Sequence, residues 1–218
     1  MSLESVQTRR RAAGGLLLAS LAALASPALA EAGGGRGRDL QAEQFVQVQA
    51  QRVITTLADT RMAEGEKRRA FRQVIDEVAD VPRITNFVLG KYARTITPAQ
   101  RQAFAAAFRT YAEAVYQNRL GDYRGERLKV TGSVARKPGD VVVSTLVSGG
   151  RIAEPLPVAW RVVSAGADWK LIDVQFKGVW LAITQQQDFV STIDNAGGDI
   201  GVLIARLERD ARKPGAAR

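Results

Sequence analysis

Residues 169–189 read WKLIDVQFKGVWLAITQQQDF, and the rest of the predicted fold is arranged around them. The first half of this stretch alternates in character, as a strand does, because successive side chains of a strand point to opposite faces of a sheet. The alternation predicts two faces: Trp169 and Leu171 on one, and Ile172, Val174 and Phe176 on the other.

A corner follows this strand. Gly178 allows a sharp change of direction, residues 179–183 are apolar, and three glutamines then open a helical pattern. Trp180 and Leu181 lie at the corner. Bulky apolar side chains at such a place either close a cavity between a sheet and its covering helices or fill a solid core. The residues alone leave both interpretations open.

Helices are predicted before the sheet. Apolar residues recur with helical spacing in residues 40–59, 63–79 and 84–89. A longer helix begins at Thr97, where Pro98 takes the first helical position and Gln100 completes a capping box. This helix is expected to end near Leu120 and Gly121, and it carries an apolar stripe of Phe104, Phe108, Tyr111 and Val115.

Four strands are predicted next, because β-rich segments are separated by short Pro/Gly and Gly/Gly turns. They cover residues 127–135, 140–148, 155–164 and 168–177. Short gaps of this kind favour an antiparallel meander. Two helices are expected after the corner, over residues 184–195 and from Asp199 to about residue 207. Helices, then a meander, then helices predict an α+β domain with helices at both ends of the chain.

Two blocks of the sequence resemble the MlaC/toluene-tolerance family of periplasmic lipid carriers. One is the strand motif W-K-x-x-D-V at residues 169–174 with the Gly-Val corner at residues 178–179, and the other is VLGKYARTITPAQRQAFAAAF at residues 88–108. The resemblance covers about residues 40–207. Trp180 stands where the common family form has a small residue, and GVWLAITQQQDF followed by STIDNAGG is similar to the hopanoid-associated branch.

The resemblance implies a fold and a function. The fold would be a bent four-stranded antiparallel sheet wrapped by helices, similar to the NTF2-like or cystatin-like arrangement. The function would be to carry phospholipid or hopanoid, as a monomer, between an inner-membrane ABC transporter complex and an outer-membrane lipoprotein complex. The resemblance implies no cofactor and no metal.

Residues 1–30 have the features of a secretory signal peptide. Three arginines at residues 9–11 precede a small, leucine-rich apolar run, and Ala28-Leu29-Ala30 forms an A-x-A cleavage site. The run is shorter than the roughly twenty residues that a spanning helix needs. The residues leave Sec and twin-arginine export both open. With no cysteine in the chain, export fits a bacterial periplasm and a fold without disulfides.

The rest of the chain is divided as follows. Residues 31–38 are expected to be a flexible Gly/Arg linker, residues 39–210 a single lipid-binding domain, and residues 211–218 a basic tail. The formal net charge is +9. A basic chain often binds nucleic acid, but export makes that partner unexpected, and anionic lipid headgroups fit the charge better.

The residue types exclude several chemistries. The chain has no histidine and no cysteine, which removes Ser-His-Asp and Cys-His catalysis and the usual zinc ligands. The carboxylates Asp76, Glu77 and Asp80 are expected on a solvated helix face. Asp173 alternates with apolar neighbours and is expected to pair with an arginine or lysine, or to act as the base of an NTF2-like enzyme. A cavity-free module that recruits a membrane complex is the third hypothesis.

The carrier hypothesis places a pocket between the long helix and the bulky face of the sheet, with Phe108, Tyr111, Trp160 and Leu181 facing one shared apolar space. Residues of the short helix, the long helix, the strands and the corner are predicted to contact lipid. They are Phe87, Leu89, Phe104, Phe108, Tyr111, Val115, Val143, Val158, Trp160, Val162, Leu171, Val179, Trp180 and Leu181.

The first prediction concerns processing. Because Ala28-Leu29-Ala30 has the small residues that signal peptidase requires, cleavage should leave Glu31 as the mature N-terminus. N-terminal sequencing of protein from the periplasmic fraction checks this. Recovery of a chain that starts at Met1 in the membrane fraction would contradict it.

Overall fold

The structure is a computed structural model, which describes residues 37–213 except 121–123 and 167, and leaves out the side chains of residues 116–120. The described residues belong to one compact unit, Gly34–Arg218. The expected signal peptide, most of the linker and the end of the tail lie outside the described residues. Six α-helices and a short 3₁₀ helix occur in the described part: α1 Leu40–Ala58, α2 Glu64–Val78, α3 Val81–Val88, η1 Gly90–Arg94, α4 Pro98–Leu120, α5 Leu181–Asn195 and α6 Ile200–Ala211.

Side-chain caps explain where these helices begin. The predicted capping box is confirmed, since the Gln100 amide N–H donates to Thr97 Oγ1 at 3.2 Å and the Thr97 N–H donates to Gln100 Oε1 at 2.9 Å. Asp199 caps α6 as expected, by accepting from the Gly201 N–H. Asp80, expected to be solvated, instead caps α3 through the Arg83 N–H. Local sequence therefore fixes these helix starts.

Five strands form one antiparallel sheet, in which the order of the strands is their order in the chain. They are β1 Glu126–Lys137, β2 Asp140–Gly149, β3 Ile152–Ala165, β4 Asp168–Phe176 and β5 Val179–Trp180. The predicted α+β meander is confirmed. The difference is β5, a two-residue strand that the sequence analysis assigned to the corner, and that folds back on β4 through the pair formed by Phe176 and Val179.

A bulge in β4 corrects the predicted faces of this strand. Leu171 is opposite Val162 and Asp173 is opposite Arg161, so Ile172 is an extra residue without a partner in β3. The extra residue returns Val174 to the face of Leu171, whereas strict alternation predicted that they lie on opposite faces. Asp173 consequently lies on the other face, beside Arg161.

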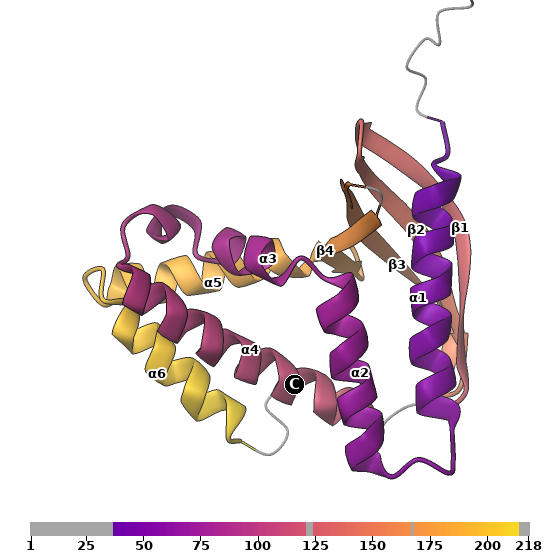
Figure 1. The fold of residues 1–218 in the computed structure, drawn as a ribbon, viewed down its shortest axis with the longest axis horizontal. Helices are drawn as coiled ribbons and strands as arrows, with labels where there is room; N and C mark the ends of the chain where they lie inside the picture. Colours follow the sequence, from indigo (N-terminus) through magenta and orange to yellow (C-terminus); the bar gives the residue numbers. More distant parts are fainter. Residues whose placement is uncertain (1–36, 121–123, 167, 214–218) are drawn as a thin grey trace, which may run out of the picture. The chain divides into compact units, whose positions relative to one another are not determined.

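Helix α1 packs on one face of the sheet (Figure 1). Ala42 and Val46 are buried against a cluster of valines from β2 and β3. The start of α1 is fixed by Ser133 of β1, whose hydroxyl accepts from the Asp39 N–H and donates to Glu43, both at 2.7 Å. Arg38 also bonds Glu43, and this hydrogen bond is the main cause of the lowered pKa of the Glu43 carboxyl. We call the apolar cluster under α1 the sheet cluster.

The other helices bury a second group of apolar side chains, which we call the helical cluster. It is built from Val88, Leu89, Phe104, Ala107, Ala182, Phe189, Ile193, Ile200, Leu203 and Leu207. Helices α4 and α6 lie side by side, and α3 lies along α5 (Figure 1). Residues from before and after the sheet in the chain are therefore packed together in one core.

Polar contacts connect α2 to the other elements. The ion pairs of Arg109 with Asp76, at 2.5 Å, and of Arg72 with Glu113, at 3.0 Å, join α2 to α4. Asp76 is exposed, as expected for a solvated helix face, and in addition has a partner on α4. The Asp80 N–H donates to the Leu171 carbonyl at 2.9 Å, where the chain between α2 and α3 meets the outer edge of β4.

The second prediction tests the helical cluster. Phe104 is fully buried, so Phe104→Ala should lower the free energy of unfolding by about 3–5 kcal/mol. Phe87 on α3 is the matched control, because its side chain is exposed and Phe87→Ala should cost about 1 kcal/mol or less. Urea unfolding of both variants measures the difference. Equal losses would mean that Phe104 is not a core residue.

Candidate functional site

Three aromatic rings form the centre of the helical cluster. Phe104 and Phe108 of α4 are stacked with ring centroids 5.7 Å apart, and Phe189 of α5 meets both rings edge-on at 5.7 and 5.6 Å. These are favourable aromatic geometries. Phe108 therefore packs against two rings, and a substitution of Phe108 by leucine should carry the cost of a packed core position.

Trp160 is the largest side chain of the sheet cluster. Its indole Nε1 donates to Thr145 Oγ1 at 2.9 Å, and that hydroxyl donates to the Val158 carbonyl at 2.9 Å. The buried polar groups beneath the indole ring thus have partners. Val158 lies on the same face of β3 as Trp160, since both alternate with Ala159.

The structure divides the predicted lipid-contacting residues into separate groups. Leu89, Phe104, Phe108 and Tyr111 belong to the helical cluster. Val143, Trp160, Val162 and Leu171 belong to the sheet cluster. Phe87, Val179 and Leu181 are exposed, Val158 is buried, and Val115 and Trp180 are half-buried. Phe108 and Tyr111 thus lie in one cluster, Trp160 lies in the other, and Leu181 is exposed, so these four residues do not face one shared apolar space in this structure. Contact of these residues with lipid stays a prediction.

Sequence reasoning missed part of the helical cluster. Phe189, Leu203 and Leu207 are fully buried there, but they were not among the predicted site residues. The sequence predicted helices at these positions, but it could not show that their partner is the aromatic stripe of α4.

Two adjoining depressions are lined by residues of α1 and β4, and the second also by residues of α2. One, of about 330 Å³, is lined by Gln41, Gln44, Phe45, Val48, Gln49 and Trp169. The other, of about 240 Å³, is lined by Phe45, Gln49, Arg52, Glu77, Val78, Asp168, Trp169 and Lys170. None of the predicted lipid-contacting residues lines either depression. Both are open and have polar side chains in their walls, glutamines in the first and charged residues in the second, so they do not provide the apolar enclosure that a lipid chain requires.

Asp173 connects the sheet to α5. Its carboxylate is buried and its Oδ1 accepts from the Val174 N–H at 2.8 Å and from the Ala182 N–H at 2.9 Å. Ala182 lies in the first turn of α5, where amide groups have no partner inside the helix. The expected ion pair is not formed, because Arg161 binds Asp140 through two hydrogen bonds of 3.0 and 2.7 Å. Asp173 therefore acts as a cap for the corner.

The environments of these two carboxylates shift their pKa values in opposite directions. Burial raises the pKa of Asp173, with the two backbone hydrogen bonds and Arg161 opposing the rise. The hydrogen bond from Arg161 lowers the pKa of Asp140, despite burial.

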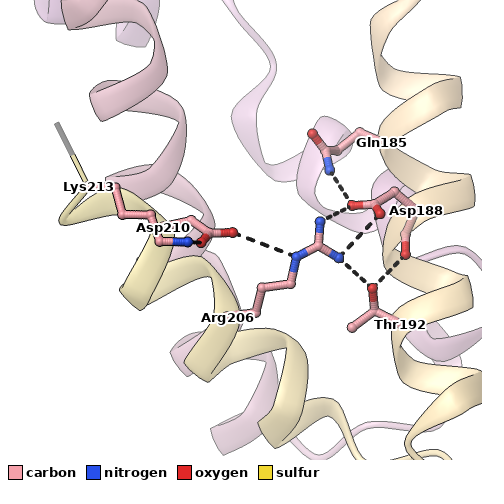
Figure 2. Close-up of polar contacts among 6 residues, drawn as sticks. All are labelled: Gln185, Asp188, Thr192, Arg206, Asp210 and Lys213. Atoms are coloured by element: carbon pink, nitrogen blue, oxygen red, sulfur yellow. Dashed lines mark hydrogen bonds and ion pairs between the residues drawn. The ribbon is translucent and has the colours of Figure 1, made fainter. Parts of the chain in front are cut away.

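A polar network joins α5 to α6 (Figure 2). The Arg206 guanidinium donates to both oxygens of Asp188, at 3.2 and 2.7 Å, and to Thr192 Oγ1 at 2.6 Å. Arg206 is also 3.7 Å from Asp210, which pairs with Lys213 at 2.7 Å. The network fixes the last helix against α5, so that the apolar face of α6 stays on the helical cluster.

The described residues contain no group of acidic side chains placed to hold a metal ion. Nor does any helix in the described part of the chain combine the length and hydropathy needed to cross a membrane.

An antiparallel meander, a capped glycine corner and a separate helical cluster define an α+β protein. The family model described as MlaC protein matches residues 47–209. The chain belongs to the MlaC family, which confirms the resemblance seen in the sequence; membership of the hopanoid-associated branch stays a prediction.

Known proteins resemble the chain over much of its length. The toluene tolerance protein ttg2D of Pseudomonas putida is 25% identical over 136 residues, which are 62% of this chain and 63% of that protein. The intermembrane phospholipid transport system binding protein MlaC of Haemophilus influenzae is 24% identical over 132 residues, 58% of this chain and 60% of that protein. Both matches thus span less than two thirds of the relatives' own lengths.

A solved structure is also similar. It is a phospholipid-binding protein from Ralstonia solanacearum in complex with a phospholipid, with a TM-score of 0.67 and 26% sequence identity. The similarity covers 78% of this chain and 96% of that chain. The fold expected from the resemblance is thereby confirmed.

The third prediction follows from the opposite pKa shifts. Folded Asp173 keeps a proton above the ordinary Asp pKa of about 3.9, so its stabilising contribution is complete below that pH and is lost as pH rises through the raised pKa. We expect the free energy of unfolding of the wild type to fall relative to Asp173→Asn across this window.

Asp140→Asn provides the matched control. Because the folded pKa of Asp140 is lowered, its contribution is present above the ordinary pKa and is lost as pH falls. The wild type should therefore gain stability relative to Asp140→Asn as pH rises. Urea unfolding between pH 3 and pH 8 measures both trends, and the same trend for both variants would refute the assignment for Asp173.

Proposed function

We propose that this protein is a periplasmic lipid carrier that shields apolar lipid groups from water and exchanges them with an ABC-type transport system. The observation that carries the proposal is membership of the MlaC family together with the fold shared with a phospholipid-binding protein that was solved with its lipid. The proposal includes export by cleavage of residues 1–30, and partners in an inner-membrane transporter and an outer-membrane lipoprotein complex.

Carriage has a simple physical requirement. Exposing an acyl chain to water costs about 0.8 kcal/mol per CH₂ group, so a carrier must replace that water with apolar side chains. Among the described residues, the helical cluster and the sheet cluster have no residue in common. They are connected by polar contacts, namely the Asp173 cap and the hydrogen bond from Asp80 to Leu171.

This arrangement supports a binding site between the two clusters. The helical cluster keeps its aromatic centre if it moves away from the sheet, because Phe104, Phe108 and Phe189 contact one another. A lipid chain that enters between the clusters would then touch Val158 and Trp160 on the sheet side. The helical cluster and the sheet cluster would move apart, and the packing inside each cluster would be kept.

The contacts of Asp173 favour a structural role over an enzymatic one. A general base must be free to take a proton from a substrate, whereas the Asp173 carboxylate already accepts two backbone N–H groups and holds the start of α5. The relatives named above carry names that refer to phospholipid transport and toluene tolerance. We therefore propose lipid carriage in place of catalysis.

Phospholipid is the proposed lipid class, and hopanoid is the specific alternative. Trp180 is half-buried at the corner, opposite Gln175 in the β4–β5 pair. A flat indole there offers a rigid face to a polycyclic ring system, whereas flexible acyl chains need a wider opening.

The fourth prediction tests carriage. Native mass spectrometry of gently purified protein should show a mass increase equal to one or more lipids, and extraction with fragmentation identifies the class. Val158→Asn should reduce the lipid-bound fraction, because it puts an amide on the face of β3 that carries Trp160.

Val163→Asn is the control for this experiment. Val163 is equally buried on the same strand but lies on the opposite face, so its substitution should cost similar stability and leave the lipid-bound fraction unchanged. Protein that is free of lipid, folded by circular dichroism and unable to take up added phospholipid or hopanoid would support the cavity-free interaction module.

A further inference from the structure

The turn between β4 and β5 and the start of α5 carry three exposed apolar side chains. Phe176 and Val179 are register partners with 37% and 49% of their surfaces exposed, and Leu181, two residues further on, is 42% exposed. Partner residues in an antiparallel pair point to the same face. We call Phe176, Lys177, Val179 and Leu181 the hairpin patch.

Lys177 occupies the tip of this patch in an unfavourable backbone conformation. Its φ of 49° makes it the one described residue other than glycine with a positive φ, and Gly178 follows at 81°. Two successive positive φ values form the two-residue turn that favours Asn-Gly and Gly-Gly. A lysine at the first position of this turn is conformationally unfavourable. Its presence there indicates that the charge at the tip has a functional role and does not serve stability.

The charge of the patch has one sign. From Val174 to Gln187 the sequence contains one charged side chain, Lys177, and no carboxylate. The Lys177 ammonium lies 5.7 Å from the centre of the Phe176 ring, so the cation and the aromatic ring are on the same side of the turn.

We propose that the hairpin patch is a bilayer-contact surface, which places Phe176, Val179 and Leu181 among the headgroups of an anionic membrane with Lys177 against a phosphate. The inference rests on the proposed function, since a lipid carrier gains from direct contact with the membrane that supplies or receives its lipid. Apolar and aromatic side chains next to a cation match the composition of such a boundary.

The small size of the patch fits a carrier. The patch has three apolar side chains and one lysine, and it would bury far less surface in a membrane than an amphipathic anchor helix does. The electrostatic attraction between Lys177 and anionic headgroups falls off within a Debye length. Contact should therefore be brief and sensitive to salt. A protein that shuttles lipid must leave the membrane after each exchange.

The test is co-sedimentation of the purified protein with vesicles of phosphatidylcholine alone or with phosphatidylglycerol. We expect binding to the anionic vesicles that weakens with salt. Lys177→Asn should reduce this binding about fivefold, the effect of one cation near an anionic surface. It should leave the unfolding midpoint unchanged or higher, because asparagine favours the turn. Lys177→Arg should bind like the wild type.

Two matched aspartate variants separate the patch from general surface effects. Val179→Asp should reduce binding at least tenfold, whereas Val202→Asp on α6, at a valine of similar exposure, should reduce it less than twofold. Equal losses for the two variants, or wild-type protein that does not bind anionic vesicles, would overturn the proposal. Unchanged vesicle binding by Lys177→Asn with loss of lipid exchange to the purified transporter would also overturn the proposal, and would assign the patch to a protein partner.

Native mass spectrometry of the same samples measures bound lipid, and so tests lipid carriage independently of membrane contact by the hairpin patch. Lys177→Asn that retains bound lipid but binds vesicles more weakly supports the bilayer contact. Bound lipid together with normal vesicle binding in Lys177→Asn refutes the contact and leaves carriage intact. If the wild type holds no lipid, the proposed function fails whatever the vesicles show.

Discussion

The buried carboxylate of Asp173 is the contact on which the corner of the structure depends. One of its oxygens receives a backbone N–H from its own strand and another from the first turn of α5. Without it, the start of α5 would be buried with an amide that has no partner, and the direction in which the last two helices leave the sheet would be undefined. The cap therefore orients the helical cluster relative to the sheet.

The cap depends in turn on one extra residue. Ile172 has no partner in β3, and this bulge turns Asp173 away from the face that carries Trp160 and toward Arg161. In a strand without the bulge, the carboxylate would face the sheet cluster under α1, where burial of a charge would be costly. Bulges are common next to functional sites because they redirect a side chain without ending the strand.

The sequence indicated much of the fold, and the reasons for its failures are physical. Caps such as Thr97 with Gln100, and turns such as Gly149-Gly150, are decided by neighbouring residues and could be predicted. The bulge at Ile172 could not, because it depends on the register with β3. Periodicity showed that Phe108 and Trp160 face inward, but it could not show that they face different clusters, since that depends on how distant helices pack.

The candidate site was accordingly predicted less well than the fold. The apolar pattern of the sequence predicts which side chains are buried, but burial alone does not distinguish a pocket wall from a packed core. The aromatic centre around Phe104 has the geometry of a packed core. On the sheet side, Val158 and Trp160 lie on one face of β3, and Trp160 packs against the sheet cluster. Contact of these two residues with lipid stays a prediction.

The order of the strands has a consequence for how the chain folds. Each strand pairs with its neighbour in sequence, so the sheet closes short loops and can form early. The helical cluster joins Phe104 to Leu203 and Leu207, residues separated by the entire sheet. It cannot be completed until the last helix of the chain is available. The aromatic stripe of α4 therefore stays uncovered until α6 has been made, and a chaperone that binds extended apolar surfaces could bind it during that interval.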